Sequence, residues 1–234
     1  MQAVILAGGR GRRLLPYTTV LPKPLMPIGD HPILEVILRQ LERAGFTDVI
    51  ISTGYLHELI QAYLAGNPHP GLSLRCSHEP EPLGTIGPLH LIPDLAETFM
   101  VMNGDILTDL NYCRLVEAHR KKGALATIAT YTREVKVDFG VLEYGKDLKI
   151  RAFREKPVNQ FDVSMGIYVF QREVLDLVPR GEPFGFDQLM HTLVQRGDPV
   201  FSYPFDGYWL DIGRPDDYAR AMEEFEKYRD RFLP

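Results

Sequence analysis

The residues best suited to chemistry follow a short apolar run near the start of the chain. Gly8, Gly9 and Gly11 stand within four positions, arginines come directly after them, and Lys23 lies between two prolines. Glycines let a backbone approach a ligand closely, and a nest of backbone N–H groups attracts anions. The arginines and Lys23 add fixed positive charge. The stretch therefore predicts a polyphosphate cradle at the carboxyl end of a buried strand, where ligands bind in open α/β sheets.

Two familiar phosphate-binding patterns do not fit this stretch. A P-loop needs Gly-Lys followed by Ser or Thr, and the chain contains no such triplet. The dinucleotide fingerprint, counted from Gly9 and Gly11, needs a third small residue where Leu14 stands. The sequence thus disfavours a P-loop kinase or ATPase and a dinucleotide-binding enzyme.

Asp105 and Asp211 are the carboxylates best placed for metal chemistry. Asp105 follows an apolar run at 99–102 with Gly104 before it, and Asp211 has apolar neighbours. Mg²⁺ on a nucleotide typically takes one or two protein carboxylates, and a charged group among apolar residues needs a partner. For Asp211 the partner is either a metal ion or a buried salt bridge. The nearby Asp109 is interpreted as a helix cap.

The elements that must position these residues alternate between strands and helices. Apolar residues share one face of a helix over 31–45, and the run at 49–51 is typical of a buried parallel strand. This alternation predicts an α/β fold with a doubly wound, mostly parallel sheet. Further helices are expected at 56–65, near Thr85, at 112–122, 172–178 and 186–196, and after Pro215, and further strands at 3–6, 72–76, 99–102 and 125–131.

The pattern changes after residue 140 to strands with few helical residues between them. They are expected at 141–144, 148–153 and 163–170. This predicts an antiparallel excursion added to the parallel sheet. The length of 234 residues, without a repeat or a low-complexity linker, suits a single domain over 1–234.

Composition narrows the class of protein. Hydrophobic content of 45% and charged content of 24% are ordinary for a soluble globular protein, and a net charge of −5 argues against a general nucleic-acid binder. No apolar run approaches the roughly 20 residues of a membrane span, and glycines interrupt the first run too early for a signal peptide. Two cysteines suggest a reducing compartment. We therefore expect a cytoplasmic protein that binds neither nucleic acid nor membranes.

Five separated motifs resemble those of the sugar-1-phosphate nucleotidyltransferases, in the family's order. The first is Gly-Gly-x-Gly-x-Arg-Leu-x-Pro with Pro-Lys-Pro after it, in which Arg12 replaces the usual Thr or Ser. The others are Glu-Pro-Glu-Pro-Leu-Gly-Thr at 79–85, Asn-Gly-Asp at 103–105, Phe-Gly and Glu-Lys-Pro between 139 and 157, and Trp-Leu-Asp-Ile-Gly at 209–213. The loop at 79–85 is most similar to that of mannose-1-phosphate guanylyltransferases. The chain resembles a short form of the family, without the C-terminal β-helix of longer members.

The resemblance implies a Rossmann-like nucleotide-diphospho-sugar transferase fold and a Mg²⁺-dependent reaction. An NTP and a sugar 1-phosphate would give an NDP-sugar and pyrophosphate, with residues 1–131 mainly binding nucleotide and residues 132–234 mainly binding sugar phosphate and supplying a closing helix. The implied catalytic residues are Arg13, Lys23, Asp105 and Asp211, of which the two aspartates hold Mg²⁺. The implied nucleotide-binding residues are Leu6, Gly8, Gly9, Gly11, Glu79, Gly84 and Thr85. The implied sugar-phosphate-binding residues are Gly104, Gly140, Glu155, Lys156 and Gly166.

The base, the sugar and the oligomeric state stay open at this point. GTP with mannose or heptose 1-phosphate is the first expectation, because the carboxylate of Glu79 could accept hydrogen bonds from the N1–H and amino group of guanine. The alternatives are dTTP or UTP with glucose 1-phosphate, a phosphocholine-type cytidylyltransferase, and a catalytically silent regulatory homologue. Ser164 stands where the family usually has Asn. Family members often form dimers or tetramers, which makes a homo-oligomer one of the expectations.

Overall fold

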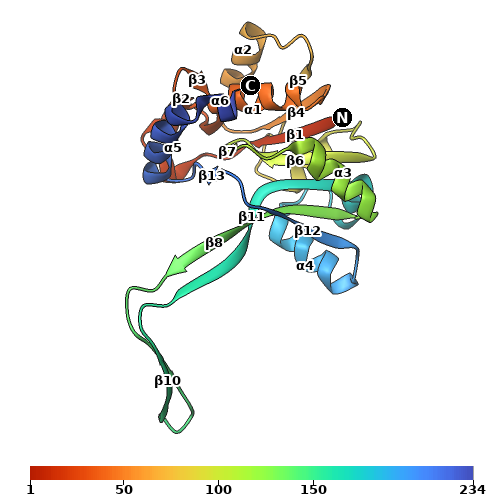
Figure 1. Ribbon diagram of the computed structural model, residues 1–234. Helices are drawn as coiled ribbons and strands as arrows, with labels where there is room; N and C mark the ends of the chain where they lie inside the picture. Colours follow the sequence, from red (N-terminus) through yellow and green to blue (C-terminus); the bar gives the residue numbers. More distant parts are fainter. Residues whose placement is uncertain (234) are drawn as a thin grey trace.

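A sheet of seven strands forms the centre of the molecule (Figure 1). The computed structural model describes residues 1–233. In sheet order the strands are β12 (Val200–Phe205), β8 (Ala126–Lys136), β11 (Val158–Gln171), β6 (Thr98–Asn103), β1 (Gln2–Ala7), β4 (Asp48–Thr53) and β5 (Ser73–His78). All run parallel except β11, which is antiparallel to both of its neighbours. The predicted mostly parallel sheet with an antiparallel excursion is confirmed.

Helices cover both faces of the sheet, because strand side chains alternate between two cores. Ile5 and Met102 belong to one core, and Val4 and Val101 belong to the other. The first core is covered by α1 (Ile33–Arg43), α2 (His57–Gly66), α3 (Tyr112–Lys122), α5 (Pro215–Lys227) and α6 (Arg229–Phe232). The second is covered by α4 (Phe186–Arg196) and the 3-10 helices η4 (Gly87–Leu91) and η5 (Arg172–Leu177). The sheet is therefore doubly wound, and none of these helices is both long and apolar enough to span a bilayer.

One helix cap differs from the expectation. Asn111, directly before α3, accepts a hydrogen bond from the Arg114 N–H at 3.1 Å. Asp109, interpreted above as a cap, instead accepts one from the Tyr208 N–H at 2.7 Å and pairs with Arg231. It stands two residues too early to cap α3, so that prediction was wrong.

A second expectation also needs correction. The helix expected near Thr85 is only the short 3-10 helix η4, which begins at Gly87. Gly84 adopts a left-handed conformation with φ +81°, and Thr85 bonds to another segment of the chain instead of opening a helix. Residues 172–177 likewise form a 3-10 helix, η5, rather than an α-helix.

A long arm leaves the sheet (Figure 1). β8 and β11 pair in unbroken register from Thr130 opposite Ser164 to Lys136 opposite Val158. The hairpin of β9 (Val141–Tyr144) and β10 (Ile150–Arg154) continues from the end of this ladder. We call residues 132–164 the arm and the rest of the described chain the body.

Candidate active site

The carboxyl ends of the parallel strands bring the predicted glycine loop to one edge of the sheet. β1 ends at Ala7, and the loop that follows is tied to the ends of its two neighbours. The Tyr55 N–H, just after β4, donates to the Gly8 carbonyl at 3.3 Å. The Gly104 N–H, just after β6, donates to the Leu6 carbonyl at 2.9 Å. This edge is the place where open α/β sheets bind their ligands.

Lys23 and Asp105 form an ion pair at this edge. Their side chains are only 13% and 17% exposed, respectively. The second carboxylate oxygen of Asp105, Oδ1, is buried and has no hydrogen-bond partner within the described residues. A buried, unpaired carboxylate oxygen is costly. The site therefore leaves one acceptor free for a cation or a donor that comes from outside the chain.

A short strand pair brings Asp211 beside Asp105. β13 (Trp209–Asp211) pairs antiparallel with β7 (Ile106–Thr108), and Asp211 lies opposite Ile106. The Ile212 N–H also donates to the backbone carbonyl of Asp105 at 3.0 Å. Residues more than 100 positions apart in the sequence thus meet at the same point of the sheet edge.

Arg13 completes the charged group. A Cβ placed on Gly213 would lie 3.3 Å from both Arg13 Nη2 and Asp211 Oδ2. The guanidinium and the carboxylate therefore share the space beside this glycine, where any larger residue would crowd them. Arg13, Lys23, Asp105 and Asp211, the four residues predicted to be catalytic, are brought together by the fold.

Burial and a neighbouring charge make Asp211 unusual. Burial raises the pKa of Asp211, the negative charge of Asp105 raises it further, and the charges of Lys23 and Arg13 act in the opposite direction. The two cationic side chains do not fully offset the combined effect of burial and the neighbouring negative charge on this pKa. An additional positive charge at this point would relieve it.

This arrangement fits a bound Mg²⁺. The unpaired Oδ1 of Asp105 and the carboxylate of Asp211, whose pKa burial raises, are hard oxygen ligands, the kind that Mg²⁺ prefers. Residues 1–233 contain no cluster of three or more His, Cys, Asp or Glu side chains with metal-binding geometry. Two carboxylates suffice for a magnesium ion whose other ligands are phosphate oxygens and water.

The glycine loop packs closely against Glu79. A Cβ on Gly8 would collide with Glu79 Oε1, and one on Gly54 would lie 2.9 Å from the Gly8 carbonyl oxygen. Gly9, by contrast, has no atom within 4 Å of its added Cβ, so its backbone faces open space. Gly11 has φ +60°, a conformation that favours glycine. The loop thus packs against Glu79 at Gly8, whereas its backbone is accessible at Gly9.

Glu79 itself is buried, with 8% of its surface exposed. Its Oε2 accepts a hydrogen bond from the Leu83 N–H at 3.1 Å, which holds the loop at 79–83. Burial raises the pKa of Glu79, and the hydrogen bond from Leu83 lowers it by a smaller amount. Oε1 is the oxygen that remains beside the glycine loop.

Gly84 and Thr85 contact the segment before α4. A Cβ on Gly84 would lie 2.7 Å from the Phe184 carbonyl oxygen. Thr85 Oγ1 accepts a hydrogen bond from the Phe186 N–H at 2.8 Å, at the first turn of α4. In the structure both residues anchor this helix, and their nucleotide contacts stay a prediction.

Sequence reasoning missed an aromatic pair next to Asp211. The Trp209 indole Nε1–H donates to the Met165 carbonyl at 3.0 Å, and its ring lies 5.4 Å from that of Tyr131. Gly166, which follows Met165 in the chain, has φ +73°, and a Cβ added to it would lie 2.5 Å from Asn103 Nδ2. The presence of only one tryptophan in the chain, within the Trp-Leu-Asp-Ile-Gly motif, was the available signal.

Three predicted sugar-phosphate residues lie elsewhere. Gly140, Glu155 and Lys156 are exposed residues of the arm, on either side of the β9–β10 hairpin. Their nearest contacts are local, since a Cβ on Gly140 would lie 2.6 Å from the Phe153 ring. Figure 1 shows β10 far from β7 and β13, which carry the charged group. The structure therefore does not place these three residues at the site of their own chain, whereas Gly104 and Gly166 are there.

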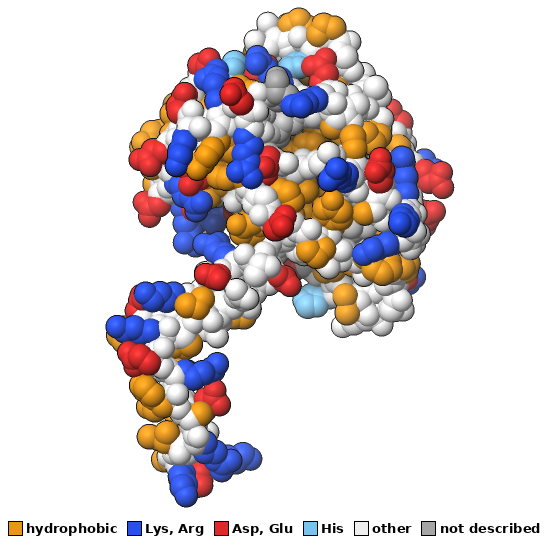
Figure 2. Space-filling view, viewed as in Figure 1, with side chains coloured by type: hydrophobic (Ala, Val, Ile, Leu, Met, Phe, Trp, Pro, Cys, Tyr) orange, Lys and Arg blue, Asp and Glu red, His pale blue; other side chains and the backbone are white. Residues whose placement is uncertain are grey.

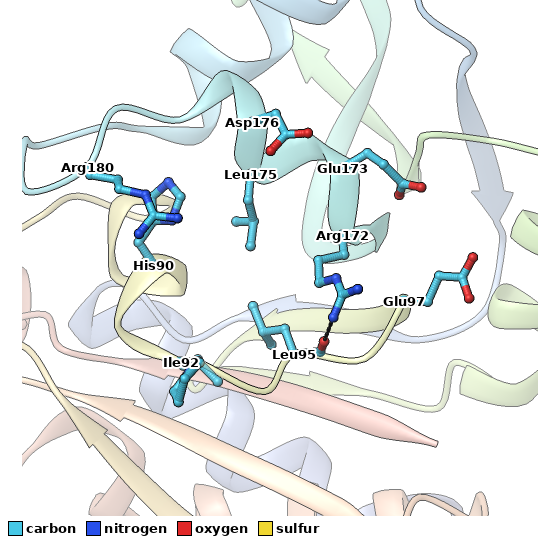
Figure 3. Close-up of a pocket in the computed structure, with 10 residues that line it drawn as sticks. His90, Ile92, Leu95, Glu97, Arg172, Glu173, Leu175, Asp176 and Arg180 are labelled. Carbon is cyan, nitrogen blue, oxygen red and sulfur yellow. Dashed lines mark hydrogen bonds between the residues drawn. The ribbon is translucent and has the colours of Figure 1, made fainter.

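A separate cavity opens at the opposite edge of the sheet (Figure 3). Its volume is about 660 Å³, and it lies beside residues 92–97, which precede β6. Arg172, which follows β11, donates to the Leu95 carbonyl at 3.2 Å across it. Acidic and basic side chains both line the cavity, so it lacks the one-sided charge of the group around Asp105.

Comparisons with known proteins agree on one family. Residues 2–228 match the nucleotidyl transferase family. A UTP–glucose-1-phosphate uridylyltransferase of Synechocystis sp. is 35% identical over 242 residues, which cover 95% of this chain and 62% of that relative. A D-glycero-α-D-manno-heptose 1-phosphate guanylyltransferase of Aneurinibacillus thermoaerophilus is 34% identical over 233 residues, which cover 97% of this chain and 100% of that relative. The chain thus spans less than two thirds of the first relative and the full length of the second.

Solved structures show the same likeness. A crystal structure of HddC from Yersinia pseudotuberculosis has a TM-score of 0.76 and 27% identity, covering 96% of this chain and 99% of HddC. A second HddC structure, complexed with GMP-PN, has a TM-score of 0.73, 26% identity and the same coverage. The α/β architecture is therefore shared over nearly the whole chain.

Proposed function

The chain belongs to the nucleotidyl transferase family, and on that premise we propose that it transfers a nucleotidyl group from an NTP to a sugar 1-phosphate. The products would be an NDP-sugar and pyrophosphate. The observation that carries the proposal is the group formed by Arg13, Lys23, Asp105 and Asp211 next to the glycine loop. Residues 1–131 would mainly bind the nucleotide, and residues 132–234 would mainly bind the sugar phosphate.

The chemical step needs positioning and charge neutralisation more than acid–base catalysis. An oxygen of the sugar phosphate attacks the α-phosphorus of the NTP, and the bond between that phosphorus and the pyrophosphate oxygen breaks. The attacking phosphate is already ionised at neutral pH, so no side chain has to remove a proton. Placing two anions in line and stabilising the charge that moves onto pyrophosphate then supply the catalysis.

The charged residues divide this work. Arg13 and Lys23 would neutralise the β- and γ-phosphates and the departing pyrophosphate. Asp105 and Asp211 would hold Mg²⁺, which when bound supplies positive charge at the α-phosphate. Lys23 would exchange its partner Asp105 for phosphate oxygens when the nucleotide arrives. Lys156 would hold the phosphate of the attacking sugar.

We propose GTP and a manno-configured sugar 1-phosphate as the substrates. The relative that this chain spans completely is a heptose 1-phosphate guanylyltransferase, and HddC has been crystallised with GMP-PN. Glu79 Oε1 lies beside Gly8 and is available as an acceptor for the N1–H and amino group of guanine. Uracil presents no such pair of neighbouring donors.

UTP with glucose 1-phosphate is the second candidate. It is favoured by the uridylyltransferase of Synechocystis sp., whose identity of 35% is similar to that of the guanylyltransferase. The cytoplasm is the proposed location of either reaction, because both consume an NTP and the chain has two free cysteines, Cys76 and Cys113.

The deciding experiment is pyrophosphate release with five NTPs and a panel of sugar 1-phosphates, with Mg²⁺ and with EDTA. We expect the highest kcat/KM for GTP with mannose or heptose 1-phosphate, and no turnover in EDTA. A preference for UTP or dTTP with glucose 1-phosphate would reject the base and sugar and retain the reaction. Absence of turnover with every pair would reject the proposed reaction.

A further inference from the structure

The loop that follows β1 is basic along its whole length. Residues 8–23 contain three arginines, one lysine and no acidic residue, in a chain with a net charge of −5. Over the face of the molecule that Figure 2 shows, basic and acidic side chains are instead interspersed. Arg13 and Lys23 belong to the charged group around Asp105. The other two basic residues of the loop, Arg10 and Arg12, are exposed.

The charged group around Asp105 supplies no surplus of positive charge. Lys23 pairs with Asp105, and Arg13 shares the space beside Gly213 with Asp211. The charges of two cations and two carboxylates cancel when all four groups are ionised. The triphosphate of an NTP carries more negative charge than one Mg²⁺ neutralises. The proposed reaction therefore favours a further cation at this loop.

Arg10 lies over the aromatic ring of Tyr55. The central carbon of its guanidinium is 5.7 Å from the centre of the ring. Arg10 takes part in no salt bridge within residues 1–233. An aromatic face attracts a cation without neutralising it, so the N–H groups of the guanidinium stay available for an anion. The ring thus holds Arg10 at the loop and leaves its charge uncompensated.

Tyr55 is itself anchored to both ends of the loop. Its N–H donates to the Gly8 carbonyl at 3.3 Å, and its hydroxyl donates to the Thr19 carbonyl at 3.0 Å. The neighbouring Thr18 is buried, and its hydroxyl donates to the Gly11 carbonyl at 2.9 Å. These contacts join the second half of the loop to the first half and to the end of β4. The ring of Tyr55 is therefore fixed relative to the loop that carries Arg10.

Arg12 lacks comparable support. It begins the short 3-10 helix η1 (Arg12–Leu14) and is exposed, and within the described residues it lies over no aromatic ring. A long, flexible side chain loses rotamer freedom when it binds a ligand, and a contact that already restricts the side chain reduces this cost. Arg10 is therefore the better candidate of the two.

We propose that Arg10, held by Tyr55, binds the terminal phosphates of the NTP and stays with pyrophosphate when that product forms. Arg10 contacts the substrate directly, and Tyr55 is a positioning residue. The inference rests on the proposed function, because it adds a residue to the phosphate site of Arg13 and Lys23. The accessible backbone of Gly9, directly before Arg10, gives the phosphates room to approach.

Steady-state kinetics with the NTP that the wild type prefers separates this role from a structural one. Arg10→Gln should raise the KM for the NTP about tenfold, because a charged hydrogen bond to phosphate is lost. The kcat should fall by less than about threefold, since the contact already exists in the ground state. The KM for the sugar 1-phosphate should stay within about twofold of the wild-type value.

Arg43→Gln is the charge-matched control. Arg43 is exposed in the last turn of α1, just before β4 begins, and so lies at the opposite edge of the sheet. Its removal lowers the net charge by the same amount and should leave both KM values unchanged. A KM for the NTP in Arg10→Gln that equals the value in this control would overturn the proposal.

Two variants of Tyr55 test the positioning role. Tyr55→Phe keeps the ring beneath Arg10 and should leave the KM for the NTP within about twofold of wild type, whereas Tyr55→Leu should raise it about fourfold. Adding Tyr55→Leu to Arg10→Gln should raise the KM no further, because Tyr55 acts through Arg10. Equal effects of the two Tyr55 variants, or full additivity in the double variant, would overturn the role of the ring.

Calorimetric titration tests the phosphate contact without turnover. The probes are the preferred NTP, its monophosphate and pyrophosphate, each with Mg²⁺. Arg10→Gln should weaken the binding of the NTP and of pyrophosphate about tenfold and leave that of the monophosphate unchanged, because the monophosphate lacks the terminal phosphates. Equal weakening of all three would overturn the proposal. Wild-type protein that turns over no substrate pair would instead reject the proposed function.

Discussion

The two halves of β11 differ sharply in burial. From Met165 to Phe170 every residue is buried between the two helical layers, whereas from Val158 to Ser164 the strand is exposed or half-buried. One strand thus belongs first to the arm and then to the core. Burial in the body fixes the geometry of the charged group around Asp105. The arm, by contrast, is held in place only by the hydrogen bonds between its own strands. The predicted site residues therefore come from two parts of the chain, the packed body and the exposed arm, and only those in the body are held by a core.

The largest effect is expected where the body performs chemistry. Asp105→Asn should lower turnover by about 1,000-fold, because one ligand of the proposed metal loses its charge while the side chain keeps its size. Pyrophosphate release measures the rate, and circular dichroism confirms the fold. Asp216→Asn, an exposed aspartate in the first turn of α5, is the control and should stay near the wild-type rate. A near-normal rate for Asp105→Asn would contradict its role.

The second effect compares one residue type in the two halves of β11. Phe170 is fully buried, and Phe161 is 54% exposed. Phe170→Ala should lower the free energy of unfolding by about 3–5 kcal/mol, whereas Phe161→Ala should change it by less than about 0.5 kcal/mol. Urea unfolding followed by circular dichroism measures both values. Similar losses at both positions would show that arm and body unfold as one unit.

The third effect is a loss of stability in acid that belongs to the body alone. His119 is buried, and this burial together with the charge of Arg120 lowers its pKa to about 4. Between pH 6.5 and about 4 the unfolded chain binds a proton here that the folded chain excludes, so stability falls as the pH drops through this range. The shift corresponds to on the order of 3 kcal/mol. The arm contains no histidine.

The variant His119→Gln measures this contribution. Its free energy of unfolding should fall less steeply than that of the wild type between pH 7 and pH 4.5. His191, an exposed histidine on α4, serves as the control in His191→Gln. Parallel curves for wild type and His119→Gln would assign the acid sensitivity to other groups.

The smallest effect concerns the choice of the nucleotide base. We expect this choice to depend on Glu79, which belongs to the body. Glu79→Gln should lower the preference for GTP over UTP by about tenfold, because an amide replaces a charged acceptor. The ratio of the two kcat/KM values measures it. Glu81→Gln, two residues further along the same loop and exposed, should leave the ratio unchanged. An unchanged ratio in Glu79→Gln would restrict this carboxylate to holding Leu83.

The body could be predicted from the sequence to a large extent. The apolar run at 99–102 and the periodic helix at 31–45 correspond to β6 and α1, because buried strands and amphipathic helices leave strong patterns. The grouping of Lys23, Asp105 and Asp211 was implied by the resemblance of their motifs to those of the sugar-1-phosphate nucleotidyltransferases. Asp109 shows the limit of this reasoning, because either Asp109 or Asn111 has the chemistry of a cap and only the helix start decides between them.

The arm could be predicted only in part. Its strands were expected, but β8 extends five residues beyond the predicted end at Tyr131, through a segment exposed on both faces. Such a segment has no alternation of apolar and polar residues from which a strand can be inferred. The position of Lys156 relative to Asp105 depends on the direction in which the paired strands β8 and β11 leave the central sheet. No local sequence pattern encodes that direction.

The place of β1 in the middle of the sheet has a consequence for synthesis on the ribosome. β4 and β5 follow β1 first and can pair on one side of it, but its other neighbour, β6, ends only at Asn103. At about 5–20 residues per second, the 25 residues from His78 to Asn103 take about 1–5 s to appear. During that interval the apolar β1 has an open edge, which is a template for pairing with other nascent chains. Rapid translation or chaperone cover of this early fragment should therefore improve the yield of folded protein.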